Sequence, residues 1–222
     1  DYPSSAAFET ALHREYRVAV AFAHCRLRKV EQWKYTMVFW ALSDVPMLTA
    51  YDEAEELLIR IQERLPGGTL AQKAGKELAD MYYRQNKMEQ AATAYQLFLE
   101  LYPKSLYREY ALQRLIEANL ASFRGPEFDA TSLLEAQSRL LEFKQLYPSA
   151  AGRIGANELL ARIDESLAAK ELLAAHWYDR RQNYVSARYM YYRVIKDYPT
   201  TAAAQKALRR LKSLDPNLFQ TA

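Results

Sequence analysis

The sequence contains a single cysteine, Cys25, and only six glycines among 222 residues. One cysteine excludes an internal disulfide framework and any metal site built from several cysteines. The scarcity of glycine, with abundant Ala, Leu, Glu, Lys, Arg and Gln, favours helix along almost the whole chain. Half of the residues are apolar, so a chain of this length can bury a sizeable core. We therefore expect an all-α protein.

The chain also lacks a long apolar run. Its longest weakly charged apolar stretch, at residues 35–51, is interrupted by Asp44 and Pro46 and is too short to cross a bilayer as a helix. The sequence therefore predicts no transmembrane segment. Because the chain begins at Asp1 rather than at methionine, we expect a processed or trimmed product whose signal peptide would not be visible.

Charge of one sign is not concentrated anywhere. Thirty basic and 27 acidic residues are interspersed, the formal net charge is +3, and the longest basic run is RLRK at 26–29. This pattern is typical of a solvated helical surface and argues against dedicated nucleic-acid binding. The sequence has no glycine-rich phosphate loop, Walker motif or serine-hydrolase elbow. We predict no enzyme activity and no cofactor.

The histidines and acidic pairs do not form a reactive cluster in the sequence. His24 and Cys25 are adjacent, but neighbours in a helix point about 100° apart, so we expect a partly exposed histidine beside a core cysteine. His13 and His176 lack a partner at metal-binding spacing, which predicts no metal site.

Two acidic pairs, Asp52 with Glu53 and Glu55 with Glu56, could be imagined as acid and base partners. They are better explained as the acidic first turn of a helix, where negative charge complements the helix dipole.

Proline punctuates the chain in a repeated way. Pro66, Pro103, Pro148 and Pro199 each close an amphipathic run at intervals of 37, 45 and 51 residues, and the last three stand in the similar segments LYPKS, LYPSA and DYPTT. Proline disfavours helix in the residue before it, so it ends a helix at each point. We expect three tyrosines to pack over the junctions and small hydroxyl residues to cap the next helices. These are Tyr102, Tyr147 and Tyr198, and Ser105, Ser149 and Thr200 or Thr201.

A small, large, apolar pattern precedes each of the four prolines. Such spacing places alanine where two helices approach closely and a larger side chain one turn later, where it fills the gap between them. The positions are Ala54, Leu58 and Ile61; Ala91, Tyr95 and Phe98; Ala136, Leu140 and Phe143; and Ala187, Tyr191 and Val194.

These positions resemble the 34-residue signature of the tetratricopeptide repeat family, which implies a right-handed α-solenoid with long helices. The chain departs from the signature at Gly75 and Glu171, which occupy the position of an aromatic residue. The implied organisation is a single solenoid over 1–222. Its units are approximately 4–66, 67–103, 104–148 and 149–199, followed by a terminal capping helix at 200–214.

The C-terminal half carries a narrower resemblance. A Gly-Pro loop lies within residues 123–150, and a long first helix, a tight turn and a second helix lie within 158–201. This arrangement is similar to the BamD family of periplasmic lipoproteins, which belong to the outer-membrane β-barrel assembly machinery. The resemblance implies a non-catalytic scaffold at the periplasmic side of the outer membrane. It also implies membrane association only through a lipid anchor on a segment outside this sequence.

The expected partner is a protein or peptide, such as an outer-membrane assembly component or an unfolded outer-membrane protein, held in a concave groove. The family's inward-facing positions match Lys73, Lys76, Asp80, Tyr83 and Arg84. In the last unit they match Leu172, His176, Asp179 and Arg180. We expect the cations of the first set to pair with carboxylates of a partner and Tyr83 to supply apolar contact.

One segment does not follow the helical period. Between 29 and 47, aromatic and apolar residues alternate with others at a period of two, which predicts a small hairpin inserted in the first unit. Trp33, Tyr35, Phe39 and Trp40 would form a partner interface, a membrane-facing surface or a cover for the end of the solenoid. The alternative function is a structural or oligomeric subunit of another envelope or secretion assembly that uses this insert for contact.

Overall fold

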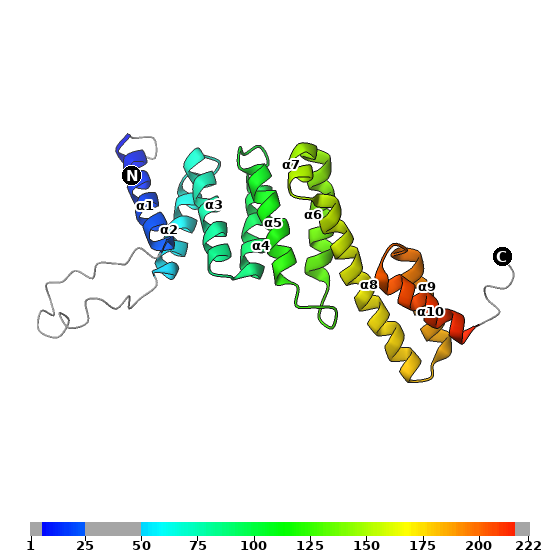
Figure 1. The fold of residues 1–222 in the computed structure, drawn as a ribbon. Coiled ribbons are helices and arrows are strands. Elements are labelled where there is room, and N and C mark those ends of the chain that lie inside the picture. The colour runs from blue at the N-terminus through cyan, green and yellow to red at the C-terminus, as the bar shows by residue number, and fades with distance from the viewer. Residues whose placement is uncertain (1–5, 25–49, 216–222) are drawn as a thin grey trace, which may run out of the picture. The chain divides into compact units, whose positions relative to one another are not determined.

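The computed structural model describes residues 6–24 and 50–215, and every regular element within them is an α-helix (Figure 1). The predicted all-α class is confirmed. The predicted hairpin at 29–47, with Trp33, Tyr35, Phe39 and Trp40, lies outside the described residues.

The described chain divides into two compact units, the first ending at Leu115 and the second beginning at Ile116. In the first unit α1 packs against α2, α2 against α3 and α3 against α4, and α1 also contacts α3. Its helices are α1 (Ala6–Ala23), α2 (Tyr51–Arg64), α3 (Thr69–Arg84), α4 (Met88–Leu101) and the first half of α5 (Arg108–Ser122).

The second unit is organised in the same way. Helix α8 packs against α9, α9 packs against α10, and α10 returns to contact α8, while α6 and α7 lie against the first part of α8. Consecutive antiparallel pairs that also contact the helix after next are typical of tetratricopeptide-like packing. The helices are α6 (Thr131–Leu146), α7 (Pro148–Arg153), α8 (Ala156–Arg180), α9 (Tyr184–Asp197) and α10 (Ala202–Leu214). The boundaries of a single solenoid remain a prediction.

The residue before each repeated proline ends a helix with almost the same backbone geometry. Leu65, Tyr102, Tyr147 and Tyr198 have φ values of −135°, −127°, −133° and −133° and ψ values of 64°, 59°, 62° and 55°. Each still donates its N–H to the carbonyl four residues back. Because proline excludes the helical conformation from the preceding residue, the last turn closes and the chain then leaves the helix axis.

The predicted helix caps are confirmed at one position and wrong at another. The Thr201 side chain accepts the N–H of Ala204 at 3.1 Å and caps α10. The Ser105 hydroxyl accepts the N–H of Tyr107, within the turn that leads into α5. Ser149 does not cap a helix, because Pro148 is already the first residue of α7, a position where the missing amide hydrogen costs nothing.

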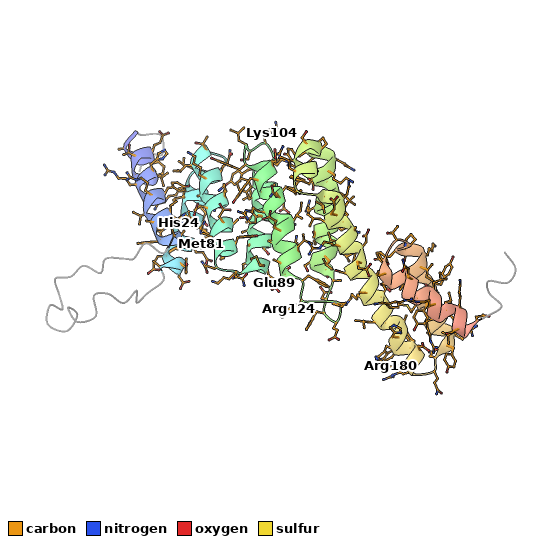
Figure 2. The ribbon with its side chains drawn as sticks, viewed as in Figure 1. His24, Met81, Glu89, Lys104, Arg124 and Arg180 are labelled. Carbon is orange, nitrogen blue, oxygen red and sulfur yellow. The ribbon has the colours of Figure 1, made fainter. Side chains whose placement is uncertain are left out.

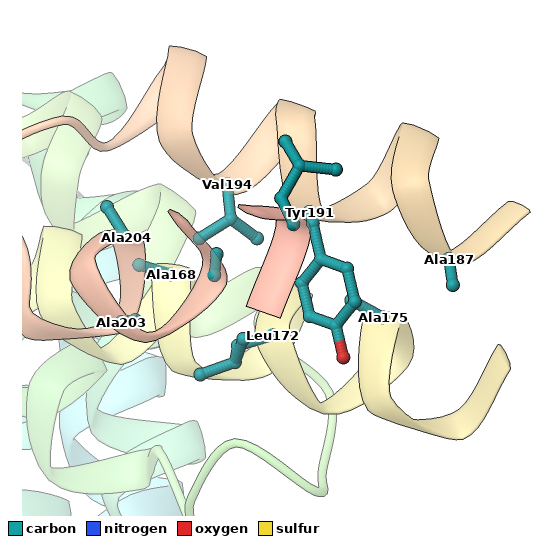
Figure 3. Packing of buried hydrophobic residues seen from close by; sticks show 10 residues of the cluster. Ala168, Leu172, Ala175, Ala187, Tyr191, Val194, Ala203 and Ala204 are labelled. Carbon is teal, nitrogen blue, oxygen red and sulfur yellow. The ribbon is translucent and has the colours of Figure 1, made fainter. Parts of the chain in front are cut away.

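The small, large, apolar pattern is confirmed as the core. Its twelve residues are at most 2% exposed. In the second unit, Tyr191 of α9 points toward Leu172 and Ala175 of α8, while Val194 lies beside Ala168 of α8 and Ala204 of α10 (Figure 3). Two of the tyrosines that precede proline lie against the large residue one turn earlier. The ring centroids are 5.2 Å apart for Tyr102 with Phe98 and 5.4 Å for Tyr147 with Phe143.

Gly75 departs from the repeat signature because the space beside it is already filled. A Cβ atom on Gly75 would lie 2.7 Å from Oε1 of Gln62 and 3.3 Å from Cδ2 of Phe98. The Phe98 ring of α4 therefore occupies the volume in which an aromatic side chain on α3 would otherwise pack.

The N-terminus of α10 receives a second cap from a distant helix. The Glu165 carboxylate on α8 accepts the N–H of Ala202 at 2.7 Å and the N–H of Ala203 at 3.1 Å. A carboxylate here satisfies amide groups that have no partner within the helix, and it also complements the positive end of the helix dipole. Glu165 thus fixes α10 against α8.

Changing Glu165 to Gln should lower the free energy of unfolding by about 1 kcal/mol, because the charge at the helix N-terminus is lost. Urea unfolding followed by circular dichroism measures the change. Glu127→Gln is the matched control, since Glu127 is an exposed loop carboxylate of the same unit. Equal effects of the two substitutions would contradict the capping role.

Candidate protein-interaction site

The five residues predicted on α3 share one side of that helix, since their spacing keeps them within about one third of a turn of each other. They are not equivalent in their surroundings. Lys73 and Arg84 are exposed, Lys76 and Tyr83 are partly exposed, and Asp80 is buried at 8% exposure. The structure thus separates an inner polar group, Asp80 with Lys76, from an outer group that includes Tyr83.

The inner group is centred on the Asp80 carboxylate. Oδ1 accepts hydrogen bonds from the hydroxyls of Tyr95 on α4 and Tyr110 on α5, the latter at 2.9 Å. Oδ2 accepts from Nζ of Lys76 at 2.6 Å. Burial, followed by the charge of Asp80, raises the pKa of the Tyr95 phenol far above its usual value. One carboxylate therefore joins α3, α4 and α5 in the first unit.

Lys76 is held between this carboxylate and two aromatic rings. Its Nζ atom lies 4.5 Å from the ring centroid of Tyr110 and 5.9 Å from that of Tyr107. Burial lowers the pKa of Lys76, but the hydrogen bond and charge of Asp80 outweigh burial and leave the pKa above its usual value. The positive charge of Lys76 is thus balanced inside the protein.

The outer group combines Tyr83 with an arginine from α5. The Arg114 guanidinium carbon lies 4.7 Å from the ring centroid of Tyr83 and 5.4 Å from that of Tyr110. Its Nε atom donates to the Tyr110 hydroxyl at 3.2 Å. A guanidinium stacked on an aromatic face is favourable and restricts both side chains. Arg114 links the exposed ring to the inner polar group.

Arg84 closes the far end of this face against α1. It donates to Glu77 at 2.7 Å and to the backbone carbonyl of Ala23 at 3.3 Å. Nε2 of His24 lies 3.2 Å from the same glutamate, and the His24 side chain is 46% exposed. Figure 2 places His24 and Met81 at this shared end of α1 and α3. The predicted partial exposure of His24 is confirmed, while Cys25 lies outside the described residues.

Lys73 is different from the other cations on α3. It is exposed, and within the described part of the chain it has no hydrogen bond or ion pair.

The acidic residues of the two predicted pairs lie on α2, and their positions and contacts there are those of a helix surface. Asp52 and Glu53 lie in its first turn as predicted, but the prediction is wrong for Glu55 and Glu56, which follow that turn. Glu56 pairs with Arg60, and Glu55 is hydrogen-bonded to Tyr82.

The second unit contains a related network when the chain is aligned on Pro103 and Pro199. Tyr191 then corresponds to Tyr95, and its hydroxyl lies 2.8 Å from Nδ1 of His176, which takes the position of Asp80. The same hydroxyl donates to Asp179 at 3.0 Å. Burial, then the hydrogen bond to Asp179, raises the pKa of Tyr191 to about 12.

An arginine from the following helix completes this second network as Arg114 completes the first. Arg210 of α10 contacts both carboxylate oxygens of Asp179, at 2.6 and 2.9 Å. These hydrogen bonds hold the pKa of Asp179 below its usual value. Asp179 thus replaces Tyr83 beneath the arginine, so an ion pair stands where the first unit has a cation over a ring.

The predicted inward-facing residues of the last unit are only partly at the surface. Leu172 is wrong as a surface residue, since it is 7% exposed and packs in the core of α8, α9 and α10. His176 and Asp179 face the network just described, and Arg180 is exposed. Within the described ranges, no three His, Cys, Asp or Glu residues are grouped in a way that could hold a metal ion.

The sequence reading missed the contributions of α5 and of the second helices. Tyr110 and Arg114 lie four residues apart on one side of α5, and Tyr107 stands in the turn just before it, three residues before Tyr110. That spacing could have identified them, but not the carboxylate that they surround. None of the helices described here is both long and apolar enough to cross a membrane.

Comparison with known proteins now identifies the family. The model of the YfiO family, described as outer membrane lipoprotein, matches residues 41–219. This chain belongs to the YfiO family. A curated relative, the outer membrane protein assembly factor BamD of Neisseria meningitidis serogroup B, is 23% identical over 192 residues, which cover 82% of this chain and 72% of the relative. BamD of Haemophilus influenzae is 25% identical over 171 residues, covering 72% and 64%.

The YfiO match includes α2 to α10 and therefore both tyrosine networks, while α1 precedes it. The resemblance to the BamD family is confirmed. The family description also confirms the predicted association with the outer membrane. Both of these relatives are named as outer membrane protein assembly factors.

Replacing Asp80 with Asn should lower the free energy of unfolding by about 2–3 kcal/mol, because the half-buried Lys76 loses its counter-charge and two tyrosine hydroxyls lose a charged acceptor. Urea unfolding measures this loss. Lys76→Met is the companion variant, and the double variant should lose less than the sum of the two single losses. Strictly additive losses would show that the pair is not coupled.

Stability should also fall at alkaline pH. A folded-state pKa of about 12 for Tyr191 means that the unfolded chain ionises first, near pH 10, so the stabilisation is complete below pH 10 and is lost between pH 10 and about 12. We expect Tyr191→Phe to reduce the slope by about 1.4 kcal/mol per pH unit in this window. Urea unfolding across the window tests this, and an unchanged slope would contradict it.

Proposed function

We propose that this YfiO-family chain is a non-catalytic interaction subunit on the periplasmic side of the outer membrane. It binds an outer-membrane assembly component or an unfolded outer-membrane protein on the exposed side of α3. The relatives named as outer membrane protein assembly factors support the class of partner. The observation that supports the location is the stacking of Arg114 on the Tyr83 ring. This pair is held in place by hydrogen bonds from Arg114 to Tyr110 and from Tyr110 to Asp80.

The contacts give each predicted residue a distinct role in this proposal. Lys76 and Asp80 are positioning residues, because they bond each other and hold α4 and α5 against α3. Tyr83 and Arg114 provide a rigid surface of the residue types that dominate binding energy at protein interfaces. Pre-organised side chains lose little entropy when a partner binds.

The cations at the two ends of α3 supply charge. Lys73 is exposed and is available to a carboxylate of the partner. Arg84 is already engaged by Glu77, so its contact with a partner would be shared with that glutamate. Exposed charges of this kind increase the association rate more than they increase affinity. The aromatic residues at 33–40 lie outside the described residues, so the proposal is based on α3 and α5.

Changing Tyr83 to Ala should weaken partner binding by about 2 kcal/mol, because the ring that orders Arg114 is lost. Lys73→Glu should weaken binding by about 1 kcal/mol, chiefly through a slower association rate. The measurement is surface plasmon resonance of the immobilised chain with a urea-unfolded outer-membrane β-barrel protein freshly diluted into buffer.

Lys87→Glu is the matched control for Lys73→Glu, because Lys87 is an exposed lysine in the turn between α3 and α4. Thermal unfolding of each variant verifies that it is folded. If Tyr83→Ala and Lys73→Glu bind as the unmodified chain does, the α3 surface is not the binding site. An equal loss in Lys87→Glu would indicate non-specific charge attraction instead.

A further inference from the structure

The side of α9 that points away from the core carries large apolar and aromatic side chains. Val185, Tyr189 and Tyr192 are 76%, 63% and 54% exposed, and Lys196 is exposed on the same side. These four residues, which we call the outer face of α9, recur at intervals of three and four residues opposite the buried face. None of them contributes to the core of the second unit.

The repeat itself shows that the fold does not require such residues. Helix α4 has the same length as α9 and the same position relative to its proline. At the four matching positions it carries Glu89, Thr93, Gln96 and Glu100, which is the polar composition expected of a solvated helix face. Helix α6 is intermediate, since Leu134 and Leu141 alternate there with Ser138 and Gln145. The tyrosines and the lysine are therefore specific to α9.

The charges beside this outer face nearly balance, while the one charge on the face itself, that of Lys196, is positive. The one acid within α9, Asp197, lies 3.9 Å from Arg193, which also pairs with Glu171. Arg188 pairs with Asp215 at 3.0 Å. Lys196 has no ion pair within the part of the chain that the structure describes. A ligand that approaches the outer face therefore meets tyrosine rings and the exposed ammonium group of Lys196, which lies on that face while Asp197 lies to one side of it.

We propose that the outer face of α9 lies against an anionic phospholipid surface. Tyrosine is enriched at the headgroup level of membranes, where the ring is apolar and the hydroxyl is hydrated. Lysine can extend its ammonium group toward lipid phosphates while its stem stays among apolar groups. The outer face consists of four residues on one helix, whereas a stable protein interface takes about 20–30 residues from each partner. A planar headgroup layer suits such a narrow, outward-facing strip better than a folded partner.

This contact is separate from the proposed α3 surface, and it would act together with the lipid anchor that the resemblance to the BamD family implies. The outer face of α9 is a membrane contact carried by the folded chain itself, and it would orient the second unit on the membrane.

The test is co-sedimentation of the full chain with sucrose-loaded vesicles of phosphatidylethanolamine and phosphatidylglycerol. The test variant transfers the α4 residues to α9, as Val185→Glu, Tyr189→Thr, Tyr192→Gln and Lys196→Glu together. These residues already occupy this position in a folded helix of the same protein, so we expect an unchanged melting temperature. The partition coefficient should fall about tenfold or more, because apolar contact is lost and a cation near the anionic surface is reversed.

Lys87→Glu with Gln90→Glu is the matched control, because it makes the same change in net charge at exposed positions outside α9. The proposal predicts that this control binds as the unmodified chain does and that vesicles of phosphatidylcholine alone bind the unmodified chain weakly. Equal binding of the test variant and the unmodified chain would overturn the proposal, as would equal loss in the control or no binding by the unmodified chain. A dimer in sedimentation velocity without vesicles that the test variant abolishes would also overturn it, in favour of a second copy of the chain.

Discussion

A buried tyrosine on the second helix of a pair needs a polar partner on the first helix, and much of the structure follows from this need. Tyr95 and Tyr191 are completely buried, yet each carries a hydroxyl whose burial without a hydrogen bond would be costly. Asp80 and His176 provide the partners at matching positions. The requirement restricts the rotation of one helix relative to the other, because the tyrosine hydroxyl must lie within hydrogen-bond distance of its partner.

The polar partner then creates a requirement of its own. A buried carboxylate at Asp80 must be compensated, and Lys76 and Tyr110 provide the charge and the second donor. In the second unit the carboxylate to be compensated is that of Asp179, which pairs with Arg210 of α10. In both cases the helix that follows the pair supplies a side chain. Stacking is therefore specified by hydrogen bonds as well as by apolar burial, and the network holds Tyr83 and Arg114 at the surface.

Comparison of the two repeats separates what the fold needs from what the protein can use for binding. The core positions and the residues before proline are kept alike, because a change there alters packing or the path of the chain. The solvent-facing positions are free to differ, and they do: α4 presents Glu89 and Gln96 where α9 presents Val185 and Tyr192. Functional proposals are best based on such positions, since packing does not account for the residues found there.

The sequence by itself determined the helical class, the helix ends before Pro103, Pro148 and Pro199, and the twelve core positions. These features depend on local chemistry and on a period of 3.6 residues, both of which are readable along the chain. Only the tertiary structure decided the inner partners of the predicted site. Ser149 lies within a helix, and Leu172 packs in the core. Lys76 contacts Asp80 and two tyrosine rings, and Glu165 caps α10 from 37 residues away. Such contacts join residues from different helices, so they depend on how the helices are rotated and offset against each other, which a linear pattern does not encode.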